Sequence, residues 1–202
     1  MRKPVQQRGE ETRGKILSAA KDIFSEKGYH NTNTKEIARH AGIATGSVYM
    51  YFPDKKEIFM EVFRSIYREI RERVIDNNLQ ELFAADNPED IVTLMIDTLS
   101  RAHKISPLFH REVVAMVYTD PEIRRINNEE ESQIISLVKE LLQKHKDKLR
   151  VNDIEAAVRV IHQAVEETIH SINISGSDIE EERMINALKD MICTYLIKPE
   201  YL

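Results

Sequence analysis

The sequence predicts an all-α protein. Apolar side chains recur at every third or fourth position through most of the 202 residues, which is the spacing of one helix face. The chain has only six glycines and six prolines, and apolar–polar alternation typical of strands is scarce. We expect about nine helices, divided between a three-helix domain at residues 1–56 and a larger helical domain at residues 57–202.

The first quarter of the chain predicts three short helices. Residues 10–27 carry an apolar stripe and end at Gly28, where a left-handed residue is favoured. Thr34 is the expected N-cap of a second helix that ends at Gly42. A third helix follows and extends to Phe52. Three short helices with a glycine turn before the last are typical of a helix-turn-helix unit.

The rest of the chain predicts longer helices. The fourth, from Asp54, carries isoleucine and valine side chains at intervals of four residues and continues through Val74. Further helices are expected to begin at a capping residue or a proline, and the last runs from about 178 to 197. Their expected starts are Asn87-Pro88, Ser106-Pro107, Asp120-Pro121, Asn152-Asp153 and, after the break at Ser175-Gly176-Ser177, Asp178.

Charge is distributed unevenly. Residues 1–56 contain 11 basic and 6 acidic residues, although the whole chain has a formal net charge of −5. A basic end on an acidic body is consistent with binding a polyanion or with chance clustering of solvated charges.

The composition also indicates in which cellular compartment the protein is expected. Cys193 is the only cysteine, which excludes an intrachain disulfide, and the longest apolar run, at 113–118, is too short for a bilayer. No apolar segment follows the basic N-terminus, so we expect a cytoplasmic protein without membrane contact.

The third helix has an unusual outward face. On a helical wheel, Gly46, Ser47 and Met50 point away from the core. Tyr49 and Tyr51 lie on the two flanks. Small side chains would let the backbone approach base edges in a major groove, and tyrosine hydroxyls could reach the phosphates on either side. The alternative is that both tyrosines only cover the core.

Two helix starts add candidate phosphate contacts. Lys55 and Lys56 begin the fourth helix, and Thr34 and Lys35 begin the second. Backbone N–H groups at such positions attract phosphate. For each lysine alone, simple solvation is an equally good interpretation.

Residues 12–59, TRGKILSAAKDIFSEKGYHNTNTKEIARHAGIATGSVYMYFPDKKEIF, resemble the N-terminal domain of the tetracycline-repressor (TetR) family of bacterial transcriptional regulators. The pattern consists of I…AA…F…G, then T…IA..AG, then a short helix ending in Tyr-Phe, then K.E. It covers about a quarter of the chain.

The resemblance implies roles for individual residues. Thr45, Gly46 and Ser47 would face bases, and Met50 would lie against a base or sugar. The recognition helix has no Arg, Lys, Asn or Gln, so sequence would be read through hydroxyls, thymine methyls and DNA shape. The residues implied in phosphate contact are Thr34, Lys35, Tyr49, Tyr51 and Lys55, and the tail residues Arg2, Lys3 and Arg8 are weaker candidates for a neighbouring groove.

The resemblance also implies that the larger domain binds a small molecule and dimerises. The helices at about 153–173 and 178–197 are adjacent and amphipathic, and two copies would form a four-helix interface. The alternative is that both helices bury their apolar stripes within one chain. An effector would favour a dimer geometry in which the recognition helices no longer match the operator.

Candidate effector-binding residues are harder to choose. They are expected on the helices around a pocket, and the run 107–118 could line a site for a hydrophobic molecule, although ordinary core is the more common use. The only Glu-x-x-His motif ends at His170, whereas a di-iron bundle needs two, so no metal or cofactor is expected. The candidates are His103, Phe109, Glu112, Met116, His162 and Glu166.

No catalytic pattern is present. The chain has neither a glycine-rich phosphate loop nor a nucleophile elbow, and Cys193 lies on an apolar helix face without basic neighbours, so we expect no enzyme. The prediction is a cytoplasmic, homodimeric, ligand-responsive repressor that binds a palindromic operator. The alternative is a helical ligand-binding or scaffold protein with a vestigial helix-turn-helix.

Overall fold

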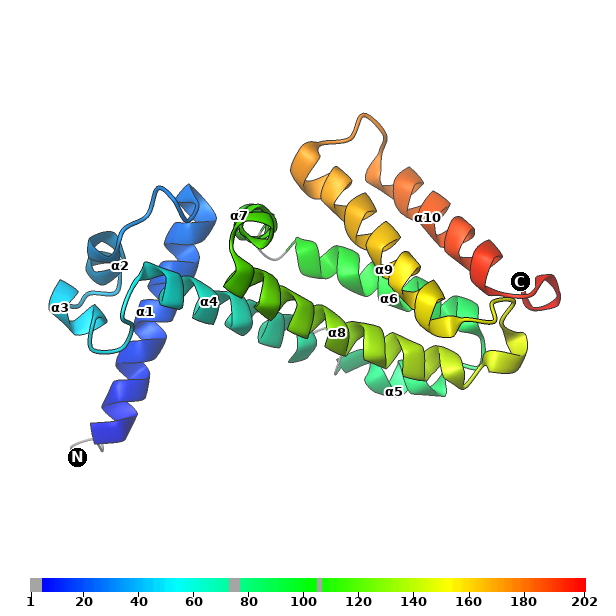
Figure 1. The fold of residues 1–202 in the computed structure, drawn as a ribbon, viewed down its shortest axis with the longest axis horizontal. Helices are drawn as coiled ribbons and strands as arrows, with labels where there is room; N and C mark the ends of the chain where they lie inside the picture. The colour runs from blue at the N-terminus through cyan, green and yellow to red at the C-terminus, as the bar shows by residue number, and fades with distance from the viewer. Residues whose placement is uncertain (1–4, 73–76, 105–106) are drawn as a thin grey trace. The chain divides into compact units, whose positions relative to one another are not determined.

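The computed structural model describes residues 5–72, 77–104 and 107–202, and it confirms the all-α prediction (Figure 1). Within those ranges no strand forms, and a single antiparallel bridge joins Leu149 to Ile197. The helices are α1 Val5–Lys27, α2 Thr34–His40, α3 Thr45–Val48, α4 Lys55–Ile70, α5 Asn77–Ala84, α6 Pro88–His103, α7 Pro107–Thr119, α8 Pro121–Gln143, α9 Ile154–His170 and α10 Glu181–Leu196. Short helical turns occur at Lys146–Lys148 and Pro199–Tyr201, and a π-helical turn at Ser171–Ser175 extends α9.

The chain divides into two compact units. The first contains residues 1–69 and 106–126, and the second contains residues 70–105 and 127–202. The expected functional boundary between residues 56 and 57 falls inside α4 and stays a prediction. Among the described residues, every helix is too short or too polar to traverse a lipid bilayer.

An aromatic cluster forms the core of the first unit. The rings of Phe24, Phe59 and Phe109 are fully buried and pack on one another, with Phe59 and Phe109 stacked at a centroid distance of 4.9 Å. The Tyr29 ring packs edge-on against Phe59 at 5.0 Å. Because aromatic rings bury large areas, this cluster fixes α1, α4 and α7 against one another.

Several expected helix ends are corrected by the structure. α1 begins at Val5 rather than residue 10, and α10 begins at Glu181 rather than Asp178. α3 ends at Val48 and continues as turns to Tyr51, because Met50 and Tyr51 donate to carbonyls only three residues back. The expected continuation of the fourth helix to Val74 lies outside the described residues.

The N-cap of α2 is also corrected. Asn33, not Thr34, caps the helix: its side chain accepts from the Glu36 amide, and the Glu36 carboxylate accepts from the Asn33 amide. This reciprocal capping box satisfies two exposed donors. α5 had no counterpart in the sequence analysis, since an eight-residue helix is too short to show a clear period.

The expected caps of the later helices are confirmed where the structure describes them. Asn87, Asp120 and Asp153 each accept hydrogen bonds from backbone amides in the first turn of α6, α8 and α9. Gly28, Gly42 and Gly176 have φ of 79°, 67° and 80° and end their helices in the left-handed region.

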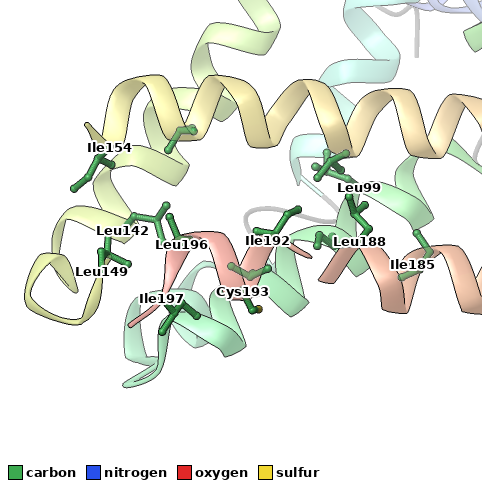
Figure 2. Close-up of a cluster of buried hydrophobic side chains, with 14 of the residues drawn as sticks. Leu99, Leu142, Leu149, Ile154, Ile185, Leu188, Ile192, Cys193, Leu196 and Ile197 are labelled. Atoms are coloured by element: carbon green, nitrogen blue, oxygen red, sulfur yellow. The ribbon is translucent and has the colours of Figure 1, made fainter. Parts of the chain in front are cut away.

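The second unit has a continuous aliphatic core, shown in close-up in Figure 2. Leu99 from α6, Leu142 from α8 and several α10 side chains meet α9 there. Cys193 lies in this cluster, and burial raises the pKa of its thiol to about 11. The prediction that this cysteine is buried is therefore confirmed, and its thiol stays protonated at neutral pH.

Candidate nucleic-acid interface and C-terminal sites

Two buried side chains hold α3 on its unit. Val48 and Phe52 are 0% and 2% exposed, while the turn before α3 is closed by a hydrogen bond from the Ile43 amide to the Ala38 carbonyl oxygen. The opposite face is open. A Cβ added to Gly46 would meet no atom within 4 Å, and Met50 is 81% exposed. The first turn of α3 therefore presents backbone and small side chains outward.

Two hydroxyl groups join α2 to the end of α3. The Thr34 Oγ1 and Tyr49 Oη atoms lie 2.8 Å apart, and Tyr49 is 53% exposed. Both residues were predicted to contact phosphate, and the structure brings them together at the surface. Either hydroxyl retains a lone pair or a rotatable hydrogen for a further partner.

The other predicted contacts lie at the edges of this face. Lys35 is exposed in the first turn of α2, and Thr45 and Ser47 are half-buried in α3. Tyr51 is half-buried against α1, and its hydroxyl would lie 4.0 Å from a Cβ at Gly9. Of the tail residues, Arg8 is exposed on α1, whereas Arg2 and Lys3 lie outside the described residues.

The side chain of Lys55 forms hydrogen bonds to backbone atoms of its own unit. Its ammonium group donates to the carbonyl oxygens of Tyr29 and Thr32, each at 2.7 Å, and lies over the Tyr29 ring. Burial lowers the pKa of Lys55, and the charge of Glu112 opposes that shift. Two of the three ammonium donors are thus used to fix the loop between α1 and α2.

Lys56 is paired with acidic groups of its own unit. Its ammonium lies 2.7 Å from the Asp120 carboxylate and 3.1 Å from the Glu122 carboxylate. The hydrogen bond to Asp120, followed by that to Glu122, raises the pKa of Lys56. Lys56 therefore forms an ion pair, although its position next to Lys55 suggested a phosphate contact. The sequence could not indicate this pair, because Asp120 lies 64 positions further along the chain.

The predicted effector residues separate into two sets. Phe109, Glu112 and Met116 belong to the first unit, where Phe109 and Met116 are buried. The Glu112 carboxylate accepts from the Tyr29 amide at 2.9 Å, directly after the end of α1. A Cβ at Gly28 would lie 2.6 Å from the same carboxylate. Glu112 thus caps the turn after α1, a partnership that sequence spacing could not indicate.

His103, His162 and Glu166 belong to the second unit. The structure brings His103 to Glu166, with Nε2 and Oε2 3.1 Å apart, and His170 approaches the same oxygen at 3.4 Å. His103 Nδ1 donates to the Leu99 carbonyl oxygen at 2.8 Å.

In this cluster, the hydrogen bonds and charges of neighbouring groups outweigh the effect of burial on the pKa values of His103 and Glu166. Burial is the largest single effect and lowers the pKa of His103, but the hydrogen bond and charge of Glu166, together with the hydrogen bond to Leu99, outweigh it, so the net shift of the pKa is upward. Burial likewise raises the pKa of Glu166, whereas its bonds to His103 and His170 hold it well below its ordinary value. The carboxylate is therefore anionic and needs a neighbouring cation.

His162 faces a different environment. It lines a cavity of about 50 Å³ whose other lining residues are all apolar. The ring is 9% exposed, and its Nε2 has no hydrogen-bond partner among the described residues. Buried polar atoms without partners are rare in native proteins and require an explanation. The apolar lining consists of Ile91, Val92, Met95, Ile96, Leu99, Ile134, Ile135, Val138, Leu142, Val158, Ile161, Val165, Ile192 and Leu196.

Comparison with known proteins gives two family matches. Residues 16–62 match the model for bacterial regulatory proteins of the tetR family, and residues 87–196 match the model for the tetracyclin repressor-like C-terminal domain.

Individual relatives are more distant. The chain is 25% identical over 124 residues to the fatty acid metabolism regulator protein of Bacillus subtilis, covering 61% of this chain and only 59% of that protein. It is 25% identical over 185 residues to the transcriptional repressor AcnR of Corynebacterium diphtheriae, covering 89% and 90% of the two chains. A solved structure from Mesorhizobium loti, assigned to the TetR family of transcriptional regulators, superposes with a TM-score of 0.78 at 21% identity, covering 95% and 99%.

Proposed function

The chain belongs to the tetR family of bacterial regulatory proteins, and from that premise we propose that it is a transcriptional repressor that binds a palindromic operator as a homodimer in the cytoplasm. The single observation that carries the proposal is the open outward face of α3. Gly46 has free space around it, and the Thr34–Tyr49 hydroxyl pair lies beside it. Such a face suits close approach of the helix to base edges, with hydroxyls on the flanking phosphates.

Lys55 supports this arrangement in two ways. Its bonds to Tyr29 and Thr32 fix the loop that leads into α2, so that the start of α2 is held in place. Its third ammonium donor is available for a phosphate oxygen. We therefore keep Lys55 in the predicted contact set, with Thr34, Lys35, Tyr49 and Tyr51.

Footprinting on the DNA that flanks the protein's own gene tests this function. At low and near-physiological salt we expect a protected, roughly palindromic site, because a specific dimer retains affinity that a purely electrostatic contact loses. Gly46→Glu, which places a carboxylate where there is free space, should abolish protection. Gly14→Glu adds the same charge at another open helical glycine and should retain it.

The two variants also separate failure of function from failure of folding. Both glycines lie in helices and neither has positive φ, so both proteins should unfold at a temperature near that of the wild type. Absence of protection by the wild type at either salt concentration would favour the alternative, a scaffold or ligand-binding protein with a vestigial helix-turn-helix.

We further propose that an apolar effector binds in the second unit, beside His162. The cavity is lined by apolar side chains and by His162, whose buried Nε2 has no hydrogen-bond partner among the described residues, and so suits an aliphatic molecule with one hydrogen-bonding group. Its volume of about 50 Å³ is a third of the roughly 150 Å³ that admits benzene in an engineered cavity. A ligand would therefore have to move the surrounding helices apart. This change in helix positions between the ligand-free and ligand-bound states would alter the affinity for DNA.

Fatty acyl compounds are the first class to test, since the Bacillus subtilis relative is named a regulator of fatty acid metabolism. We expect an active compound to raise the melting temperature and to change the footprint. His162→Phe keeps the apolar lining but removes the ring nitrogen, so it should weaken compounds that carry a polar head more than plain alkanes. Equal weakening of both would argue against recognition by His162.

A further inference from the structure

A cluster of three side chains in the second unit has the composition of a metal site. His103 comes from the end of α6, while Glu166 and His170 come from adjacent turns of α9. Their donor atoms all lie within 4.8 Å of one another. The cluster is separate from the His162 cavity, whose lining includes none of the three residues.

The distances within the cluster fit a tetrahedral ion. The Glu166 Oε2 atom lies 3.1 Å from His103 Nε2 and 3.4 Å from His170 Nε2. In a tetrahedral zinc site with bonds of about 2.0–2.1 Å, neighbouring ligand atoms are roughly 3.3 Å apart. The two distances from Glu166 therefore already resemble those between neighbouring ligands of a zinc ion.

The orientation of His103 is an independent observation. Its Nδ1 lies 2.8 Å from the Leu99 carbonyl oxygen, and a carbonyl can only accept, so Nδ1 carries the hydrogen. In the neutral ring the lone pair is then on Nε2, which faces Glu166. Metal-bound histidines commonly have their second nitrogen fixed by such a carbonyl.

The charge and burial of the cluster also favour a cation. The side chains of His103, Glu166 and His170 are only 8%, 22% and 21% exposed, so the carboxylate is largely removed from water. Burial of a carboxylate is costly unless a cation balances it.

We propose that His103, Glu166 and His170 bind a divalent transition-metal ion of the zinc class. Two imidazole nitrogens and one carboxylate oxygen select zinc, nickel, copper or iron over magnesium and calcium, which prefer all-oxygen sites. Binding links α6 to α9 through the ion.

No metal is expected from the sequence, because it contains only one Glu-x-x-His motif. This proposal departs from that expectation, since the third ligand comes from α6 and not from a second copy of the motif. It is independent of the proposed DNA binding, which concerns the other unit.

Titration of the full-length protein, freed of metal with a chelator, tests the proposal. We expect calorimetry with zinc chloride to give one ion per chain, with a melting temperature several degrees higher in the loaded protein. Cobalt(II) should show the intense visible absorption of a tetrahedral site. Glu166→Gln and His170→Gln should each weaken binding at least tenfold, whereas His145→Gln, a histidine of the same unit outside the cluster, should leave it unchanged.

Two results would overturn the proposal. One is the absence of zinc or cobalt binding by the wild type at micromolar concentrations. The other is binding of unchanged affinity in both cluster variants, which would place the ion elsewhere. In either case the three side chains serve only as a polar bridge between α6 and α9. The cobalt spectrum of the wild type decides the matter even if a variant fails to fold.

Discussion

The ammonium nitrogen of Lys55 lies 2.7 Å from the carbonyl oxygen of Tyr29 and 4.1 Å from the centroid of the Tyr29 ring. The first residue of α4 thereby holds the end of the turn after α1. A cation–π contact and two charge-assisted hydrogen bonds act together at one side chain. Lys55 is thus a structural residue, and its predicted contact with phosphate would be a second role.

Lys55→Ala should consequently lower both stability and DNA affinity. The loss of two hydrogen bonds to a charged donor predicts a decrease of about 1–3 kcal/mol in the free energy of unfolding. DNA affinity should fall for all sequences alike. Lys35→Ala serves as the control: it should lower affinity and reduce the salt slope by about 1, with no change in melting temperature. An unchanged melting temperature for Lys55→Ala would contradict the structural role.

The Thr34–Tyr49 hydroxyl pair predicts a different pattern. Tyr49→Phe removes one hydroxyl from an exposed position, so affinity for every operator should fall by about 1 kcal/mol, roughly fivefold. Ser47→Ala should instead change which sequence is preferred, since Ser47 is expected to face bases. Binding measured against an operator library separates the two outcomes. A uniform loss in Ser47→Ala would show that Ser47 does not read sequence.

Asp120 should make stability depend on pH. The hydrogen bond from Lys56 lowers the pKa of Asp120 below its ordinary value of 3.8, against a smaller effect of burial. Because the folded-state pKa is depressed, the stabilisation is complete above the unfolded pKa and is lost as pH falls through the folded one.

The matched variant is Asp120→Asn, which keeps a good N-cap for α8 but removes the ion pair. Near pH 7 we expect the free energy of unfolding of the wild type to exceed that of the variant by about 0.2–1 kcal/mol, the usual value for an ion pair at the protein surface. The difference should vanish in acid, at a pH well below the ordinary pKa of 3.8, where the folded-state carboxyl is also protonated. Urea unfolding at both pH values measures it, and a difference that persists in acid would rule out the charge of Asp120 as its source.

The outer faces of α9 and α10 carry apolar side chains suited to the proposed dimer. Val160 and Met191 are 59% and 54% exposed in the single chain. Introducing a carboxylate at both positions, as Val160→Glu and Met191→Glu, should convert a dimer into a monomer, because a charge buried in an interface is costly. Light scattering on a gel-filtration column measures the mass. Tyr118→Glu, at a residue 77% exposed on α7, should remain dimeric.

Loss of the dimer should also reduce operator affinity, since one helix-turn-helix unit can contact only one half-site. A double variant that stayed dimeric would exclude the last two helices as the interface.

Local patterns account for most of what the sequence predicted correctly. The buried stripes of Ile16, Phe24, Ile58 and Val62 follow from helical spacing, and the glycine turns follow from their permitted φ. The outward position of Gly46 and Met50 follows from the wheel of α3. The end of α3 was wrong because its last turn uses hydrogen bonds three residues apart, which apolar spacing does not reveal.

Side-chain partnerships distant in sequence were decided only by the tertiary structure. Lys56 pairs with Asp120 although 64 positions separate them, and His103 meets Glu166 from a different helix. Periodicity determines which face of a helix is buried, because each face depends only on residues three or four apart. It does not determine which faces meet, because that depends on packing of the whole unit. The sequence by itself thus determined the helices and the helix-turn-helix unit. Packing created the His103–Glu166–His170 cluster, and it buried the Nε2 atom of His162 without a hydrogen-bond partner among the described residues.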